Sequence, residues 1–466
     1  MTSASTGVET APAPGSPPAS PTEPDAVPPA ESDEGPAATS AAVPGAGPAA
    51  PFGPATALVC RECAERYELG ARYACDQCFG PLEVGYDFGS VTRQQIETGP
   101  ASIWRYAPLL PVPAQAAQRP IDLSPGWTRL HRADHLAAAL GMRRVWVKDD
   151  SGNPTHSFKD RVVAVALTAA HTLGLRTVAC ASTGNLAGAV AAAAARAGMH
   201  SVVLIPDDLE DGKTLNAAVY GGTLIAIQGN YDDVNRLCSE VAFEHEDWGF
   251  VNVTLRPFYA EGSKTVGFEV AEQLGWRLPE QVVAPIASGS LLTKVDKAWR
   301  ELGTLGLVQT TPYRVFGAQA TGCSPVSQAF AAGLDIVRPV KPDTIAKSLA
   351  IGNPADGPYA LDVVRRTGGA IADVSDDEVV EGIRMLAETE GIFAETAGGV
   401  TVAVLRKLLA LGLADPDAET VVLNTGDGLK TLDAIAGVVG PSATIRPTLD
   451  AFRAAELGPH REAGQA

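Results

Sequence analysis

The chain has 466 residues, of which 45% are hydrophobic, and a formal charge of −18. This length allows two or three domains, and the acidic balance argues against a nucleic-acid partner. No run of about 18 uncharged apolar residues occurs, so we expect no membrane span. A basic region followed by an apolar core is missing at the N-terminus, so we expect no signal peptide. Seven cysteines, four of them close together, favour a reducing cytoplasm over a disulfide scaffold.

Residues 1–54 are of low complexity. They hold thirteen of the chain's 35 prolines, mixed with Ala, Ser, Thr and Gly, and almost no large apolar residue precedes Phe52. Such a segment cannot bury enough surface to offset the entropy that it loses on ordering. We expect a disordered Pro/Ala-rich tail here and a C-terminal tail over residues 441–466.

Two Cys-x-x-Cys pairs, eleven residues apart, lie within residues 55–88. Four thiolates on two short hairpins can hold Zn²⁺ tetrahedrally, and small modules need such a site because their own core is too small. A ribbon without metal is the alternative. A redox disulfide is disfavoured because its Cys-x-x-Cys would open a helix in a βαβ unit. The sequence predicts a structural zinc-ribbon-like module with the ligands Cys60, Cys63, Cys75 and Cys78.

Residues 89–440 alternate between strand and helix patterns. After a connector over 101–140, which ends in a short helix, apolar runs rich in Val and Ile alternate with longer segments. This pattern is typical of a parallel sheet and predicts a doubly wound α/β region with two lobes and a cleft. The expected strands are 145–148, 177–181, 201–205, 223–227, 281–286, 313–318 and 420–424. The expected helices include 159–173, 186–197, 213–220 and 231–245.

One lysine, Lys159, opens the long apolar helix predicted over 159–173. Ser157 could cap this helix, with Asp160 completing a capping box. Lys159 would then lie in the first turn of a buried helix, where burial and the helix macrodipole both lower the pKa of its amine. A neutral amine can form a Schiff base.

Three predicted strand ends carry small and polar residues, at the edge where ligands bind in such sheets. The segments 182–185 and 287–292 each follow a strand and open a helix, so their backbone N–H groups could bind an anion. Thr425 places a hydroxyl at a third strand end. Each motif alone is more often a tight turn. Together with Lys159 they predict a pyridoxal phosphate site.

These motifs resemble those of the fold type II pyridoxal-phosphate enzymes, and among them the threonine synthase family. The resemblance covers roughly residues 125–440, and the cysteine ribbon resembles that of some members. It implies a carbon–oxygen lyase that converts O-phospho-L-homoserine and water to L-threonine and phosphate. The matching stretches are Asn153-Pro-Thr-His-Ser-Phe-Lys159-Asp-Arg161, Ser182-Thr-Gly-Asn185, Glu261-Gly-Ser-Lys-Thr265 and Thr425-Gly-Asp-Gly-Leu-Lys430.

The resemblance also implies roles for individual residues. Lys159 would bond to the aldehyde carbon of the cofactor and later move protons. Asn185 would hydrogen-bond the 3′ oxygen of the cofactor, and Thr425 its pyridine nitrogen. The remaining implied contacts are Ala287, Ser288, Gly289, Ser290 and Leu291 for the cofactor phosphate, and Ser182 and Thr183 for the substrate carboxylate or phosphate.

On the substrate side the chain departs from the commoner family pattern. His156 stands where a glycine is common, either as a neighbour of the ligands or as a turn residue. Tyr259 falls where many relatives have an arginine facing the substrate phosphate. Arg256 is a candidate replacement, because an arginine fork fits phosphate, and Lys264 is a second candidate.

Other functions stay open. Tyr259 leaves room for cysteate synthase, which is similar to threonine synthase and uses phosphoserine and sulfite. The ribbon and the Thr425–Lys430 stretch disfavour threonine dehydratase, and the intact Lys159 disfavours a non-catalytic metal-ribbon binding protein. We expect a homodimer with a small-molecule substrate and neither a nucleic-acid nor a membrane partner.

Overall fold

The structure, a computed structural model, describes residues 51–118, 120–182 and 184–455. Most of the predicted tail over 1–54, the single residues Arg119 and Thr183, and the end of the predicted C-terminal tail lie outside these ranges. In the described part the strands form three sheets. Their bounds are β1 (Ala55–Cys60), β2 (Arg66–Tyr67), β3 (Leu82–Tyr86), β4 (Arg129–Arg132), β5 (Arg144–Asp149), β6 (Thr177–Ala181), β7 (His200–Pro206), β8 (Thr223–Ile227), β9 (Trp248–Phe250), β10 (Gln281–Pro285), β11 (Arg314–Ala320), β12 (Ile371–Val374) and β13 (Glu419–Asn424).

Helices connect these strands and cover the sheets. Their bounds are α1 (Arg93–Glu97), α2 (Asp134–Leu140), α3 (Lys159–Thr172), α4 (Asn185–Ala197), α5 (Asp211–Ala218), α6 (Tyr231–Glu244), α7 (Arg256–Gly262), α8 (Lys264–Gln273), α9 (Ser290–Thr304), α10 (Pro325–Ala331), α11 (Gly357–Arg366), α12 (Asp376–Glu390), α13 (Thr396–Ala410) and α14 (Leu449–Ala454).

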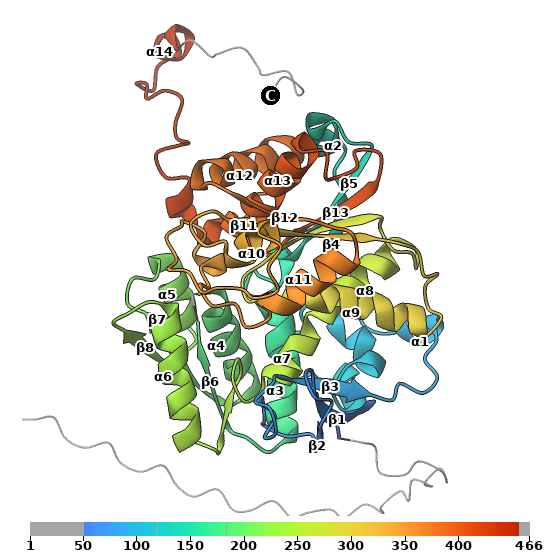
Figure 1. The fold of residues 1–466 in the computed structure, drawn as a ribbon. Helices are drawn as coiled ribbons and strands as arrows, with labels where there is room; N and C mark the ends of the chain where they lie inside the picture. Colours follow the sequence, from blue (N-terminus) through green and yellow to red (C-terminus); the bar gives the residue numbers. More distant parts are fainter. Residues whose placement is uncertain (1–50, 119, 183, 456–466) are drawn as a thin grey trace, which may run out of the picture. The chain divides into compact units, whose positions relative to one another are not determined.

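The largest sheet has the strand order β12-β11-β10-β13-β5-β4, and only β4 and β5 pair in antiparallel fashion. Successive residues of β10 enter different cores: Val282 and Ala284 pack in the cluster that includes α9, and Val283 in the one that includes α13. Helices α12 and α13 lie on one side of this sheet, and α9 and α11 on the other (Figure 1). A central parallel strand buried on both faces explains the continuous apolar run in the sequence.

The second sheet, of order β8-β7-β6-β9, is parallel throughout. Its β6 again serves two cores. Val178 and Cys180 pack in the same cluster as α3 and α4, whereas Ala179 and Ala181 pack with α6. The prediction of doubly wound α/β architecture is therefore confirmed.

The cysteine-rich segment forms a small antiparallel sheet of order β2-β1-β3. Leu58, Leu82 and Val84 are buried and belong to the same apolar cluster as α7 and α8. Tyr86 donates a 2.7 Å hydrogen bond to Glu261. The zinc-ribbon-like fold is thus confirmed, and its core continues into the α/β region.

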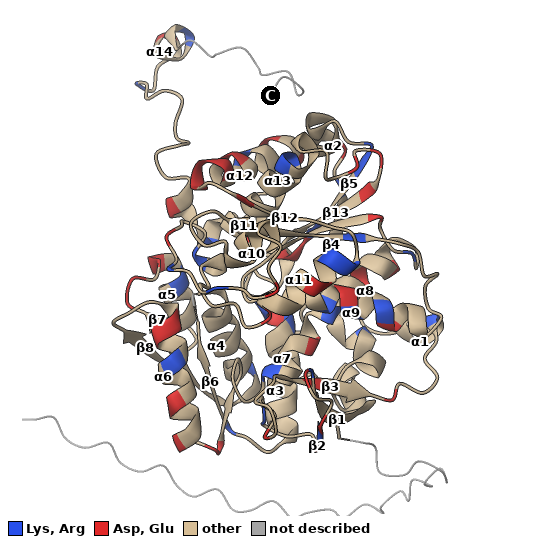
Figure 2. Cartoon of the chain, in the orientation of Figure 1, with Lys and Arg blue, Asp and Glu red and all other residues tan. Residues whose placement is uncertain are grey.

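Acidic and basic residues are interspersed on the outer helices α6 and α12 (Figure 2). Exposed pairs such as Arg236 with Glu240, 2.7 Å apart, contribute only a few tenths of a kcal/mol each. Within the described ranges, no helix is both long and apolar enough to cross a membrane.

Helix α7 packs backbone to backbone against α3 at Gly262. A Cβ atom at this position would lie 2.6 Å from the Cα of Val162 and 2.6 Å from the carbonyl oxygen of Arg161. Gly262→Ala should therefore lower the free energy of unfolding by about 1–3 kcal/mol, because the two helices must separate. Gly212→Ala in α5 is the matched control, since a Cβ there meets nothing within 4 Å. Equal urea midpoints for the two variants would contradict the prediction.

Candidate active site

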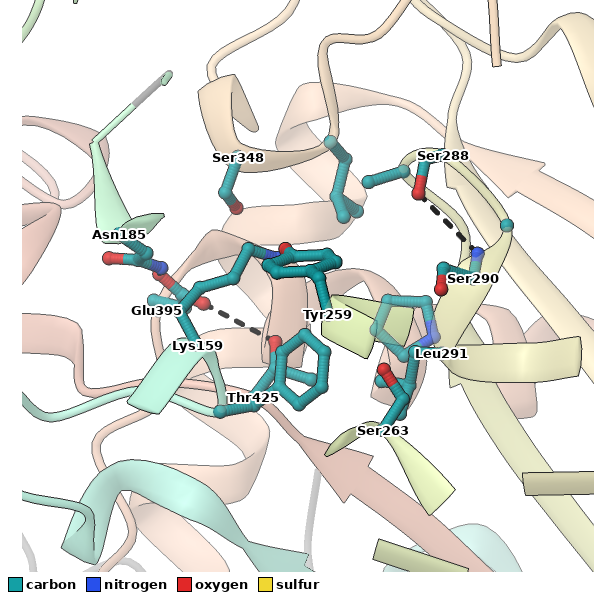
Figure 3. A pocket seen from close by; sticks show the side chains of 15 residues that line it. Lys159, Asn185, Tyr259, Ser263, Ser288, Ser290, Leu291, Ser348, Glu395 and Thr425 are labelled. Carbon is teal, nitrogen blue, oxygen red and sulfur yellow. Dashed lines mark hydrogen bonds between the residues drawn. The ribbon is translucent and has the colours of Figure 1, made fainter. Parts of the chain in front are cut away.

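The carboxyl ends of three strands and the start of α3 meet at one pocket (Figure 3). Lys159, Asn185 and Thr425 lie on one side of it, and Ser288 and Ser290 lie on the other. The lining includes every residue that the sequence predicted to bind the cofactor. The structure thus brings together four segments that are up to about 270 residues apart, at the carboxyl ends of β10 and β13 of the large sheet and of β6 of the second sheet.

Lys159 is the first residue of α3, and its side chain is partly exposed toward the pocket. Burial lowers the pKa of its amine to about 8, as the sequence predicted. The carboxylate of Glu395 opposes this shift, and the nearby cation of Lys430 adds to it. More of this amine is therefore neutral near physiological pH than of an ordinary lysine, and this neutral fraction is able to act as a nucleophile or base.

The predicted capping box at the start of α3 does not form. Phe158 is the N-cap residue and makes no side-chain cap, and the Ser157 hydroxyl has no hydrogen-bond partner among the described residues. Asp160 instead accepts 2.8 Å hydrogen bonds from both the backbone N–H and the hydroxyl of Thr155. The carboxylate that was expected to cap the helix therefore holds the turn before Lys159.

Glu395 is a pocket residue that the sequence did not single out. It is buried, and it precedes the first residue of α13. Its two oxygens accept hydrogen bonds from the amide of Asn185 at 2.8 Å and from the hydroxyl of Thr425 at 3.3 Å. Glu395 therefore orients two of the predicted cofactor ligands. The only signal in the sequence is an acid placed directly before a helix that begins Thr-Ala-Gly-Gly.

The loop after β10 is shaped as an anion cradle. Gly289 is the N-cap residue of α9 with φ of 94°, a left-handed conformation that favours glycine. The N–H of Ser290 donates a weak 3.4 Å hydrogen bond to the Ser288 hydroxyl. The first N–H groups of a helix have no helical acceptors and attract negative charge, so this loop suits a phosphate group.

Four buried polar atoms in the pocket lining need a partner. The amide oxygen of Asn185 and the hydroxyls of Ser263, Ser290 and Ser348 have none among the described residues. Because buried polar atoms are normally hydrogen-bonded, they point to a polar ligand. An amine of lowered pKa, an anion cradle and the Thr425 hydroxyl accompany them. This donor set fits pyridoxal phosphate, which has an aldehyde, a hydroxyl, a ring nitrogen and a phosphate.

A larger pocket adjoins the first and shares Lys159 and Asn185 with it. Arg256 and Ser182 line this second pocket, and Tyr259 lines both. The structure therefore places Arg256 where a substrate could reach it. The Ser182 oxygen already accepts two backbone N–H groups of the loop that begins α4. The predicted substrate contact Thr183 lies outside the described residues.

The predicted substrate contact Lys264 is placed away from both pockets. This residue lines neither pocket and is fully buried, with ion pairs to Glu261 at 2.8 Å and Glu301 at 2.9 Å. His156 also lies outside both linings; it is exposed, with φ of 61°, and thus fits the turn alternative.

The four cysteines of the ribbon can hold a metal. Their sulfur atoms all lie within 4.8 Å of one another. Tetrahedral zinc with Zn–S bonds of about 2.3 Å separates its sulfurs by about 3.8 Å, which this spacing allows. The backbone N–H groups of Glu62 and Gln77 each donate a 3.4 Å hydrogen bond to a cysteine sulfur, Cys60 and Cys75 respectively. Such bonds are expected when the sulfurs carry negative charge. The predicted zinc ligands Cys60, Cys63, Cys75 and Cys78 are those that converge here.

Comparison with known proteins decides the family. The family described as pyridoxal-phosphate dependent enzyme matches residues 121–426. A threonine synthase of Methanosarcina acetivorans is 36% identical over 410 residues, which cover 86% of this chain and 98% of that protein. A threonine synthase of Methanocaldococcus jannaschii is 36% identical over 381 residues, which cover 80% of this chain and 93% of that protein. The chain belongs to the threonine synthase family of pyridoxal-phosphate dependent enzymes.

Membership of this family confirms the resemblance predicted from the four motifs, and with it a pyridoxal-phosphate dependent enzyme. Solved structures agree on the fold. Maize serine racemase superposes with a TM-score of 0.55 at 23% identity, over 67% of this chain and 92% of that one. A pyridoxal 5'-phosphate-dependent aspartate racemase superposes with a TM-score of 0.57 at 19% identity, over 72% of this chain and 95% of that one. The roles of individual residues in this threonine synthase family member stay predictions.

Gly289→Ala should raise the dissociation constant of pyridoxal phosphate at least about tenfold. The substitution puts a Cβ 2.8 Å from the carbonyl oxygen of Asp356 and a side chain into a left-handed conformation, at a cost of about 1–2 kcal/mol. Titration of the cofactor-free enzyme, followed by absorbance, measures this constant. Gly306→Ala, at φ of 69° with nothing within 4 Å, is the control that also places a side chain in a left-handed conformation but meets no neighbour. Unchanged affinity in both variants would refute a cradle at Gly289.

Proposed function

We propose that this enzyme converts O-phospho-L-homoserine and water to L-threonine and phosphate. The observation that carries the proposal is its similarity to threonine synthases over 98% and 93% of their length. The arrangement of the two adjoining pockets supports it, because a reactive amine and a cation that suits phosphate face connected spaces.

The larger pocket would hold the substrate. Arg256 offers its guanidinium there, and the side chains of Asn252 and Asn235 line the same space. An arginine fork with neighbouring amides suits a phosphate ester, whereas the shared boundary with the first pocket would keep the amino end near Lys159. Tyr259, on the boundary, would separate the phosphate end from the cofactor.

Lys159 would carry the proton transfers. When bound, pyridoxal phosphate supplies an aldehyde that bonds an amine and a ring that withdraws electrons from the carbon beside that bond. With a pKa of about 8, the Lys159 amine can take a proton from a substrate carbon and return it at near-neutral pH. Glu395 would hold the Asn185 amide and the Thr425 hydroxyl in place through their hydrogen bonds.

The test is an assay of the cofactor-loaded enzyme with O-phospho-L-homoserine. We expect threonine and phosphate in equal amounts. O-phosphoserine with sulfite, and threonine alone, are parallel substrates for the cysteate synthase and threonine dehydratase alternatives. If the loaded enzyme forms no threonine, or forms cysteate faster, the proposal fails.

The proposal also includes a homodimeric assembly and a cytoplasmic location. It further divides the chain into the modules 55–88 and 89–440. They rest on the reducing-type cysteine usage, on the ribbon motif and on what is usual for this fold. Light scattering at micromolar concentration tests the assembly, and a single monomeric species would contradict the dimer.

A further inference from the structure

The segment between the first two cysteines of the ribbon contacts the start of α11, next to Ala355 of the larger pocket. Arg61, between the two cysteines, lies 3.3 Å from an oxygen of Asp356, and its guanidinium lies 3.5 Å from the ring centre of Tyr359. The Tyr359 hydroxyl donates a short hydrogen bond to Glu62. One side of the ribbon is therefore fastened to residues 356–359, although about 295 residues separate them in sequence.

Asp356 is shared between two arginines. Its Oδ1 faces Arg61, and its Oδ2 accepts a 2.7 Å hydrogen bond from Arg256. The carboxylate is only 8% exposed, and the backbone N–H of Asp356 donates a 2.8 Å hydrogen bond to the carbonyl oxygen of Ser288. Asp356 thus joins the ribbon and the arginine of the larger pocket through its carboxylate, and the cradle loop through its backbone N–H.

Charge in this cluster favours anion binding only while both arginines are present. Arg256 lines the larger pocket, whereas Arg61 does not. The two guanidinium groups and the carboxylate that they share carry a net charge of +1, and Glu62, held by the Tyr359 hydroxyl, is a further carboxylate on the Arg61 side. Without Arg61, Arg256 and Asp356 form a neutral pair, and Arg256 is free to turn both of its terminal nitrogens onto the carboxylate. Either change weakens the attraction for a dianion in the pocket.

We propose that Arg61 is a positioning residue for the phosphate group of the substrate. Acting through Asp356, this ribbon residue keeps Arg256 directed into the pocket and keeps the cluster positively charged. The inference rests on the proposed function for the identity of the substrate. The chemistry that it requires is only that of a phosphate group.

Arg61→Met in the full, cofactor-loaded chain tests the proposal. The KM for O-phospho-L-homoserine should rise about 5- to 20-fold while kcat changes less than about twofold, because the variant loses phosphate attraction and not the reacting amine. The dissociation constant of inorganic phosphate, measured by calorimetry, should rise by a similar factor. Arg61→Lys keeps the charge and should recover part of the loss.

Two further variants distinguish a positioning role of Arg61 from a general loosening of the ribbon. Tyr359→Phe removes the hydrogen bond to Glu62 and leaves the Arg61–Asp356 contact, so phosphate affinity should stay within about twofold of wild type. In an Asp356→Asn background, Arg61→Met should likewise have less than about a twofold effect, since the shared carboxylate is gone.

Phosphate binding by Arg61→Met at the wild-type affinity would overturn the proposal, as would an equal loss in Tyr359→Phe. The two proposals fail in different ways. If the wild type forms no threonine, the proposed function fails, and phosphate calorimetry still tests Arg61. If the wild type forms threonine and Arg61→Met matches it in KM, only the positioning role fails.

Discussion

Replacement of Lys159 by alanine should lower kcat at least about 10³-fold, which is the scale of losing a catalytic acid–base group. Lys159 is the one lysine among the described residues that line the two adjoining pockets, so no other amine can replace it. The assay is threonine formation from O-phospho-L-homoserine. As a second measurement, borohydride should fix the cofactor to the wild-type chain, and the mass of the alanine variant should stay unchanged.

Lys430→Met is the matched control for this result. Lys430 is a buried neighbour that donates a 2.7 Å hydrogen bond to the carbonyl oxygen of Thr155, and it lines neither pocket. The charge of Lys430 helps to lower the pKa of Lys159, so its removal should raise that pKa and shift the pH dependence of kcat to higher pH. The value of kcat itself should fall less than about tenfold. If the two variants lose similar activity, local charge rather than the Lys159 amine carries the reaction.

The positions of the site could be predicted where local pattern and sheet topology coincide. The apolar run 177–181 is a strand over those same residues, and Lys159 opens its helix as predicted. Parallel pairing brings the carboxyl ends of β10 and β13 to one edge of the large sheet, whereas Asn185 follows β6 of the second sheet, and the packing of the two sheets brings it to the same pocket. The family resemblance then gives each residue a role.

Partnerships between distant residues could not be predicted. Glu395 is linked to the pocket by a hydrogen bond from Asn185, which lies 210 positions earlier in the sequence. Lys264 carries a positive charge that could bind an anion, but in the structure it forms an ion pair with Glu301. The Ser157–Asp160 spacing matches a capping box, yet the Thr155 hydroxyl competes for the carboxylate. Each outcome depends on which partner lies closer after folding.

Short and polar strands were also missed. β9 has three residues and β12 four, too few for an alternating pattern to stand out. β4 reads Arg-Leu-His-Arg, without the apolar run of a central strand, because it is the antiparallel edge of the large sheet. These strands complete the sheets without contributing to the predicted cofactor site.

The largest stability effect is expected at Arg161, two residues after Lys159. Its side chain is fully buried and donates two 2.8 Å hydrogen bonds to Asp150 and two further ones to Glu269. Burial alone would raise the pKa of Glu269, but Arg161 and Lys148 lower it to about 2. This arginine therefore ties the start of α3 to the segment after β5 and to α8, which fixes the helix turn that carries Lys159.

Arg161→Met should lower the free energy of unfolding by about 3–5 kcal/mol, because two buried carboxylates are left with the single cation of Lys148. Urea denaturation measures the loss as a shift in midpoint. Arg236→Met, which removes an exposed ion pair of the same length class, should change the stability by less than about 0.5 kcal/mol. Similar midpoints for the two variants would mean that the Arg161 network tolerates an unpaired charge, and that Arg161 does not anchor α3.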